Sequence, residues 1–136
     1  MPPLSLRSAL SVTGCAVALL GTFLPWLRTG ERERSSYDLS SIAQRLQVAT
    51  STGERLAITL WPVVPFCLLS AAVLLVMRCS SGARVFAIGV SVYVGAVAVI
   101  VWRAPLDTGL GVPITVVGAA LFAVGALARE AVRNER

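Results

Sequence analysis

The chain has 136 residues, of which 56% are hydrophobic, and it carries a formal net charge of +5 with no histidine. A soluble domain of this length cannot bury so much apolar surface, so the excess must face lipid or other helices. All 12 basic residues are arginine, and they are spread along the chain instead of forming a basic face interleaved with aromatic residues, which argues against nucleic-acid binding.

Four long apolar stretches predict four membrane-spanning helices, over residues 8–27, 56–77, 85–102 and 110–128. Each has about the ~17–25 residues that a helix needs to cross ~30 Å of hydrocarbon. None of the four contains a charged residue or histidine. We therefore expect an all-α fold, an integral membrane four-helix bundle that forms a single domain over residues 1–136. Its first partner is then the lipid bilayer, and we expect no catalytic residue, cofactor or metal.

The external loop, residues 28–55, is the only segment between spans that is long enough to have its own structure. Leu39, Ile42, Ala43 and Leu46 recur at helical spacing and predict a short amphipathic helix over residues 39–49. Its apolar stripe would rest on the membrane surface or on the ends of the spans. Such a helix would either cover the mouth of the bundle or recognise a partner.

Aromatic and arginine side chains gather at the same end of the predicted spans. Tryptophan prefers the headgroup level of a membrane, and arginine binds phosphate well. An aromatic belt in one leaflet explains the tryptophans, and a rim that docks a partner or a lipid headgroup is the functional interpretation. The candidate rim residues are Trp26, Arg28, Tyr37, Arg55, Trp61, Trp102 and Arg103.

Two prolines, Pro62 and Pro65, lie inside the second predicted span. Residues 66–77 alone are too short to cross a bilayer, so the helix is expected to continue through both prolines with a kink.

Small residues at helical spacing mark the faces through which the spans should pack. Lipid tails compete well with large apolar side chains, whereas small residues let two helix backbones approach closely. We assign most of these faces to packing inside the bundle and leave the remainder for docking another protein. The residues chosen for helix packing are Gly14, Ala18, Ser91, Gly95, Gly118 and Gly125.

Four spans place both termini on one side of the membrane. Arginines divide equally between the two sides, but Arg78 and Arg84 flank a short loop that has no acidic residue. Because positively charged loops favour the cytoplasm, we expect both termini to be cytoplasmic.

The span end Leu24-Pro25-Trp26, the loop sequence Arg34-Ser35-Ser36-Tyr37 and three further spans rich in Gly and Ala resemble the uncharacterised small four-span integral membrane proteins of actinobacteria. The resemblance implies a location in the bacterial plasma (inner) membrane and no particular activity. In size and span number the chain is also similar to four-span multidrug transporters. Those proteins depend on a carboxylate in the first span, and residues 8–27 contain none.

These observations favour a non-catalytic, multi-pass accessory or scaffolding subunit of a larger cell-envelope complex, assembled with another integral membrane protein or with itself. The alternative is a small oligomeric transporter or channel with a path lined by the hydroxyls of Ser70, Ser91, Tyr93 and Thr115. A lipid-modifying enzyme using Glu54 and Asp107 is less favoured, because both acids are expected to face water.

Overall fold

The structure is a computed structural model, and it describes residues 6–29, 32–46, 51–77, 81–105 and 107–127. The chain is mostly helical, which agrees with the all-α expectation. In chain order the elements are α1 (Leu6–Phe23), β1 (Pro25–Thr29), β2 (Arg32–Ser35), α2 (Ser36–Leu46), α3 (Thr52–Leu60), the 3-10 turn η1 (Trp61–Val63), α4 (Val64–Val76), α5 (Ser81–Arg103) and α6 (Gly111–Leu127).

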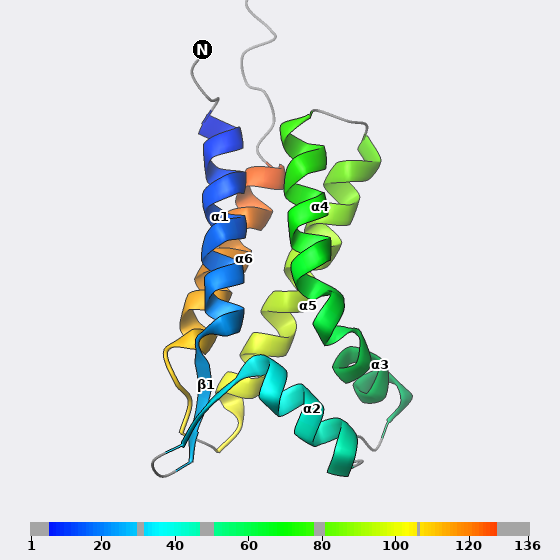
Figure 1. Ribbon diagram of the computed structural model, residues 1–136. Coiled ribbons are helices and arrows are strands. Elements are labelled where there is room, and N and C mark those ends of the chain that lie inside the picture. Colours follow the sequence, from blue (N-terminus) through cyan, green and yellow to red (C-terminus); the bar gives the residue numbers. More distant parts are fainter. Residues whose placement is uncertain (1–5, 30–31, 47–50, 78–80, 106, 128–136) are drawn as a thin grey trace, which may run out of the picture.

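The helices α1, α4, α5 and α6 lie side by side and alternate in direction (Figure 1). α1 packs mainly on α6, α6 also on α5, and α5 on α4, whereas the contact between α4 and α1 is slight. The segment from β1 to α3 gathers at one end of these four helices. We call this segment, residues 25–60, the cap.

Two continuous helical stretches in the described part of the chain, Thr52–Val76 and Gly82–Arg103, are long and apolar enough to cross a membrane. Ser8–Phe23 and Gly111–Leu127 are apolar but shorter. The first predicted span was placed too far along the chain, because α1 ends at Phe23 and not at residue 27. Pro25 explains the difference, since a proline disfavours helical geometry in the residue before it and tolerates the first position of a strand.

The stretch Thr52–Val76, which matches the second predicted span, changes direction at its prolines. α3 runs into the 3-10 turn Trp61–Val63, which contains Pro62, and Pro65 then occupies the second position of α4. Proline has no amide hydrogen to donate and crowds the preceding turn, so the helix tightens and bends there. α3 accordingly turns away from the line of α4 (Figure 1).

The cap contains a β-hairpin that the sequence interpretation missed. β1 and β2 pair antiparallel, with Leu27 opposite Arg34. The connection between α5 and α6 joins the same hairpin: the amide of Gly109 donates to the carbonyl of Trp26 at 2.8 Å, and Leu27 forms a bridge with Thr108. The hairpin therefore ties the end of α1 to the start of α6.

The amphipathic helix of the cap exists, but it begins earlier than predicted. α2 covers Ser36–Leu46 and not residues 39–49, and residues 47–49 lie outside the described chain. Ser35 explains the earlier start, because its hydroxyl accepts a hydrogen bond from the amide of Asp38 at 3.4 Å, as a helix N-cap does.

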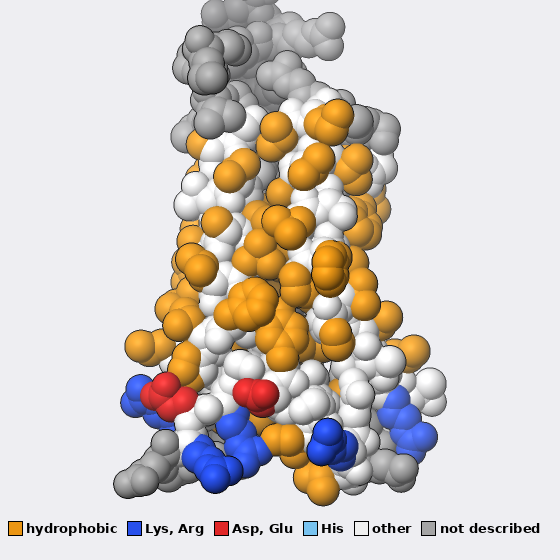
Figure 2. Space-filling model, in the orientation of Figure 1, with side chains coloured by type: hydrophobic (Ala, Val, Ile, Leu, Met, Phe, Trp, Pro, Cys, Tyr) orange, Lys and Arg blue, Asp and Glu red, His pale blue; other side chains and the backbone are white. Residues whose placement is uncertain are grey.

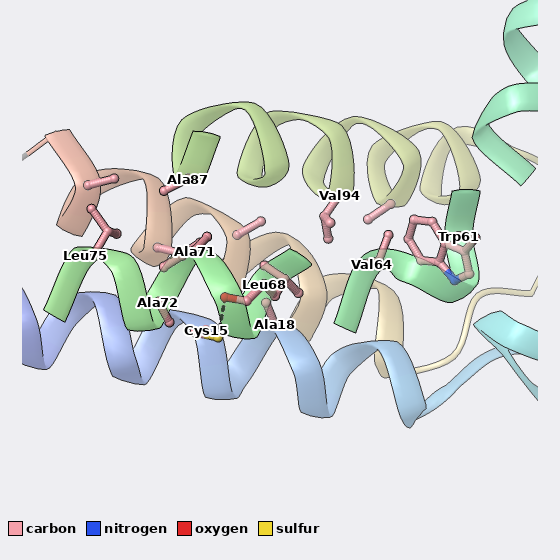
Figure 3. Close-up of a cluster of buried hydrophobic side chains, with 14 of the residues drawn as sticks. Cys15, Ala18, Trp61, Val64, Leu68, Ala71, Ala72, Leu75, Ala87 and Val94 are labelled. Carbon is pink, nitrogen blue, oxygen red and sulfur yellow. Dashed lines mark hydrogen bonds between the residues drawn. The ribbon is translucent and has the colours of Figure 1, made fainter. Parts of the chain in front are cut away.

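A buried apolar cluster fills the space between the four long helices. α4 contributes one face of evenly spaced side chains, shown in Figure 3 as Val64, Leu68, Ala71, Ala72 and Leu75. Cys15 of α1 reaches the same face, and its thiol lies 3.5 Å from the carbonyl of Leu68. This weak contact joins α1 to α4 at mid-height.

The seam between α1 and α6 is built from glycine. A Cβ atom added to Gly118 would touch the backbone nitrogen of Ala18 and lie 2.6 Å from its Cα atom. One added to Gly14 would touch the backbone nitrogen of Phe122. The two backbones are thus so close that no side chain fits between them, which is the packing that small residues permit in membranes.

The same spacing continues along the whole seam. A Cβ on Gly21 would lie 2.6 Å from the amide nitrogen of Thr115, and one on Gly125 would lie 2.6 Å from the hydroxyl of Ser11. Positions three and four residues apart alternate on both helices, as in an antiparallel coiled coil. The seam residues are Ser11, Gly14, Ala18 and Gly21 on α1, and Gly111, Thr115, Gly118, Phe122 and Gly125 on α6.

Candidate functional site

Two predicted rim tryptophans form the floor of the cap and do not face outward. Trp26 is 1% exposed and Trp61 is 3% exposed. Their rings meet edge to face with centroids 5.3 Å apart, and Tyr93 of α5 stacks beside Trp61 at 6.1 Å. Buried in this way, neither indole can reach a lipid headgroup or a partner on the rim. The structure therefore places Trp26 and Trp61 inside the protein and not on an exposed rim, whereas Trp102 is 52% exposed.

Ser36 joins three elements through one hydroxyl group. It donates to the carbonyl of Thr22 at 2.6 Å, and it accepts a hydrogen bond from the indole nitrogen of Trp61 at 3.0 Å. The carbonyl belongs to the last turn of α1, where helix carbonyls have no partner within the helix. The cap is thus fastened to the end of α1 and to the start of α4 by a single buried side chain that sequence reasoning did not single out.

Tyr37 adds a second link from α2 to α1. Its hydroxyl donates to the Thr22 hydroxyl at 3.1 Å, and its ring packs against Phe23 with centroids 5.1 Å apart. Burial raises the pKa of the Tyr37 phenol, and the hydrogen bond to Thr22 offsets part of that rise. Tyr37, a candidate rim residue, is therefore half-buried and helps to hold the cap on the end of α1.

A pocket of about 180 Å³ lies between the cap and α5. Its walls are almost entirely apolar. Side chains from α2, from α3 and from α5 surround it above the two buried indoles: Leu39, Ser40, Ala43, Ala57, Ile58, Val97 and Val101, with Ser36, Trp26 and Trp61.

The predicted rim arginines lie on three separate elements, β1, α3 and α5. Arg28 forms an exposed ion pair with Glu33 at 3.0 Å, within the hairpin. Arg55 lies in the first turn of α3, and Arg103 ends α5 with an exposed side chain. A separate polar recess lies on the outer face of α2 and involves Arg32, Arg34 and Arg45 together with Glu33, Asp38, Ser41 and Ile42.

A second apolar feature is a groove of about 350 Å³ between α1 and α4. On the face drawn in Figure 2, hydrophobic side chains follow the length of these helices. The groove is lined by Val12, Cys15, Ala16 and Leu19 of α1, and by Leu69, Ala72, Val73, Val76 and Met77 at the α4 side.

The remaining predicted packing residues lie on α5. Ser91 is buried and donates to the carbonyl of Ala87 in its own helix at 2.8 Å. Gly95 faces α6, but a Cβ there would lie 3.7 Å from the Cβ of Ala119, which is an ordinary contact. Gly95 is therefore a looser position than the glycines of the α1–α6 seam.

The groups considered for catalysis serve local structure. Glu54 and Ser51 form a capping box at the start of α3, with each side chain accepting from the other residue's amide. Asp107 has an exposed side chain, and its carbonyl accepts from the amide of Arg28 at 3.0 Å. A capping carboxylate in contact with water is not arranged as a general acid or base.

The hydroxyls considered for a conducting path are used within the protein. Thr115 donates to the carbonyl of Gly111, and Tyr93 donates to the carbonyl of Ala57 at 2.6 Å. Ser70 is exposed on α4. These positions give no observation in favour of a shared path, and the transporter or channel alternative stays a prediction.

No protein-family model matches this chain, and no curated protein or solved structure matches it.

Proposed function

We propose that this chain is a four-span protein of the bacterial plasma membrane, with both termini in the cytoplasm. Large exposed apolar side chains are distributed over all four long helices, including Leu20, Phe66, Val92 and Val124. The charged residues of the described chain lie in the first turn of α1, in the cap, at residues 103–107 and in the first turn of α5. Figure 2 shows this separation on one face. An apolar belt between two polar ends suits a bilayer.

We further propose that the chain is a non-catalytic accessory subunit that binds a helix of another integral membrane protein in the α1–α4 groove. The groove carries this proposal, because the contacts between α1 and α4 are slight and leave an apolar groove open between these neighbouring helices. Its small residues, Ala16 and Ala72 among them, let another backbone approach. Close approach of this kind favours a helix over lipid tails, which pack equally well against any apolar surface.

Substitutions that fill the groove test this function. Ala16 on the α1 wall and Val73 on the α4 wall both line the groove and are both exposed, so Ala16→Phe and Val73→Trp should leave the fold intact while blocking a helix. Ala96→Phe, at an exposed position on α5, is the matched control. Tagged variants are purified from their native membranes in mild detergent, and the co-purifying integral membrane protein is identified and then tagged in a reciprocal experiment.

We expect reciprocal co-purification of one membrane protein with the unmodified chain and with Ala96→Phe, and its loss with both groove variants. Co-purification that survives both groove substitutions would contradict a role for the groove. Recovery of only a second, differently tagged copy of the same chain would show self-association in place of an accessory role.

A further inference from the structure

The pocket beneath the cap has the properties of a ligand site and not of a packing defect. We infer that it binds one hydrocarbon chain segment of a membrane lipid. This inference rests on the membrane placement proposed above and is independent of the α1–α4 groove, which lies between other elements.

The polar atoms around the pocket already have partners inside the protein. The Ser36 hydroxyl is used by Thr22 and Trp61, the Trp26 indole nitrogen donates to the carbonyl of Gly21 at 2.9 Å, and the Ser40 hydroxyl donates to the carbonyl of Tyr37 at 2.8 Å. A water molecule in a cavity needs about two to four polar partners. Because these groups are committed elsewhere, the pocket favours an apolar occupant over water.

The size of the pocket sets the length of chain that it holds. Its volume is about 180 Å³. An apolar cavity of ~150 Å³ holds a molecule of the size of benzene, so this pocket accepts roughly six to eight carbon atoms. That is a segment of one acyl chain and not a whole lipid.

The location of the pocket identifies the source of that chain. Its walls belong to α3 and α5, and on these same helices Leu56, Leu60 and Ile100 are exposed. In the proposed membrane placement these side chains lie against the outermost part of the hydrocarbon layer. In that placement the pocket lies level with the part of an acyl chain that adjoins the headgroup, which makes a lipid chain the nearest apolar occupant.

The two buried indoles make the occupant measurable. The chain has three tryptophans, and Trp26 and Trp61 line the pocket while Trp102 is outside it. Purified protein is reconstituted in phosphatidylcholine vesicles in which the lipid is brominated near the carbonyl end of one acyl chain, because bromine quenches tryptophan at short range. Wild type is compared with Trp102→Phe, so that the exposed tryptophan reports contact with the bilayer and the other two report the pocket.

We expect Trp102→Phe to retain quenching, since its two remaining tryptophans line the pocket. In that background Ala43→Leu and Ala57→Leu fill the pocket from different walls and should remove most of the quenching. Ala96→Leu adds the same bulk on the exposed face of α5 and should not. Octan-1-ol added to Trp102→Phe without any filling substitution should compete for the pocket and relieve the quenching.

Three results would overturn the inference. The first is a lack of quenching in Trp102→Phe when wild type is quenched; the membrane placement would then stand, and the pocket assignment would fail. The second is quenching in Trp102→Phe that neither octan-1-ol nor the filling substitutions reduce. Only filling variants that keep the parent's near-ultraviolet circular dichroism, and therefore its fold, count for this comparison. The third is quenching by 1-bromooctane added to unbrominated vesicles when brominated lipid itself gives no quenching. The occupant would then be a free apolar molecule and not a lipid chain. Absence of quenching in wild type as well would contradict the membrane placement itself.

Discussion

The two sides of α1 show opposite solutions to packing between apolar helices. On one side, glycines bring α1 and α6 into backbone contact along their length. On the other side, α1 and α4 leave an apolar groove between them, although the Cys15 thiol contacts Leu68 at mid-height and Ser36 links the end of α1 to Trp61 at the cap. Without a hydrophobic driving force between helices in lipid, contact depends on the side chains that stand between the backbones. Small residues on both helices give a seam, whereas small residues opposite large ones give a groove.

The largest expected effect is a substitution in the seam. Gly118→Ala places a Cβ against the backbone of Ala18, which cannot rotate away, so the free energy of unfolding in mild detergent should fall by about 3 kcal/mol or more. Gly89→Ala is the matched control, because its Cβ would meet nothing within 4 Å and alanine favours a helix by up to ~1 kcal/mol. Equal stability of the two variants would show that the helices are less closely apposed.

A smaller effect is expected where Ser36 links the cap to α1 and to Trp61. Ser36→Ala removes the partner of both the Trp61 indole nitrogen and the Thr22 carbonyl, so the free energy of unfolding should fall by about 1–3 kcal/mol. Ser41→Ala removes an exposed hydroxyl that bonds only within α2 and should change it by less than ~0.5 kcal/mol. Denaturation of both variants in the same detergent measures the difference.

The link made by Tyr37 should depend on pH. Its phenol has a raised pKa in the folded protein, so its contribution is fully present below the unfolded pKa of about 10 and is lost as the pH rises through the folded value. Tyr37→Phe should therefore show a smaller loss of stability than wild type between about pH 9 and pH 11. Unfolding curves at several pH values provide the comparison, and identical pH slopes would exclude a neutral Tyr37 as part of the link.

The smallest effect is expected in the groove itself. Ala16 is exposed there, so Ala16→Phe should change the free energy of unfolding of the isolated chain by no more than ~0.5 kcal/mol. Thermal unfolding of the purified variant in detergent measures this. A loss as large as that of Gly118→Ala would mean that the groove is part of the tightly packed interior.

Hydropathy located the long helices well, because length and apolar composition directly reflect the solvent of a span. It missed the hairpin, since Trp26 and Leu27 continue the apolar run of α1 and their pairing with residues 32–35 and Thr108 depends on distant contacts. The aromatic preference for headgroups also failed for Trp61, because Ser36 offers its indole nitrogen a buried partner. The glycine at position 14 was recognisable from its spacing, whereas Gly21 was not chosen, although it lies three residues after Ala18 on the same face of α1.

The pairing of α1 with α6 also has a consequence for biosynthesis. α1 is translated before α4 and α5, and α6 only after them. The glycine face of α1 therefore has no packing partner while the intervening helices are inserted. During that interval α4 is the earliest long helix available to α1, and it offers no equally close fit. A ribosome stalled before Gly111 would thus leave a chain in which the α1 face that packs on α6 is still exposed. Quality-control proteases in the membrane should recognise such a chain.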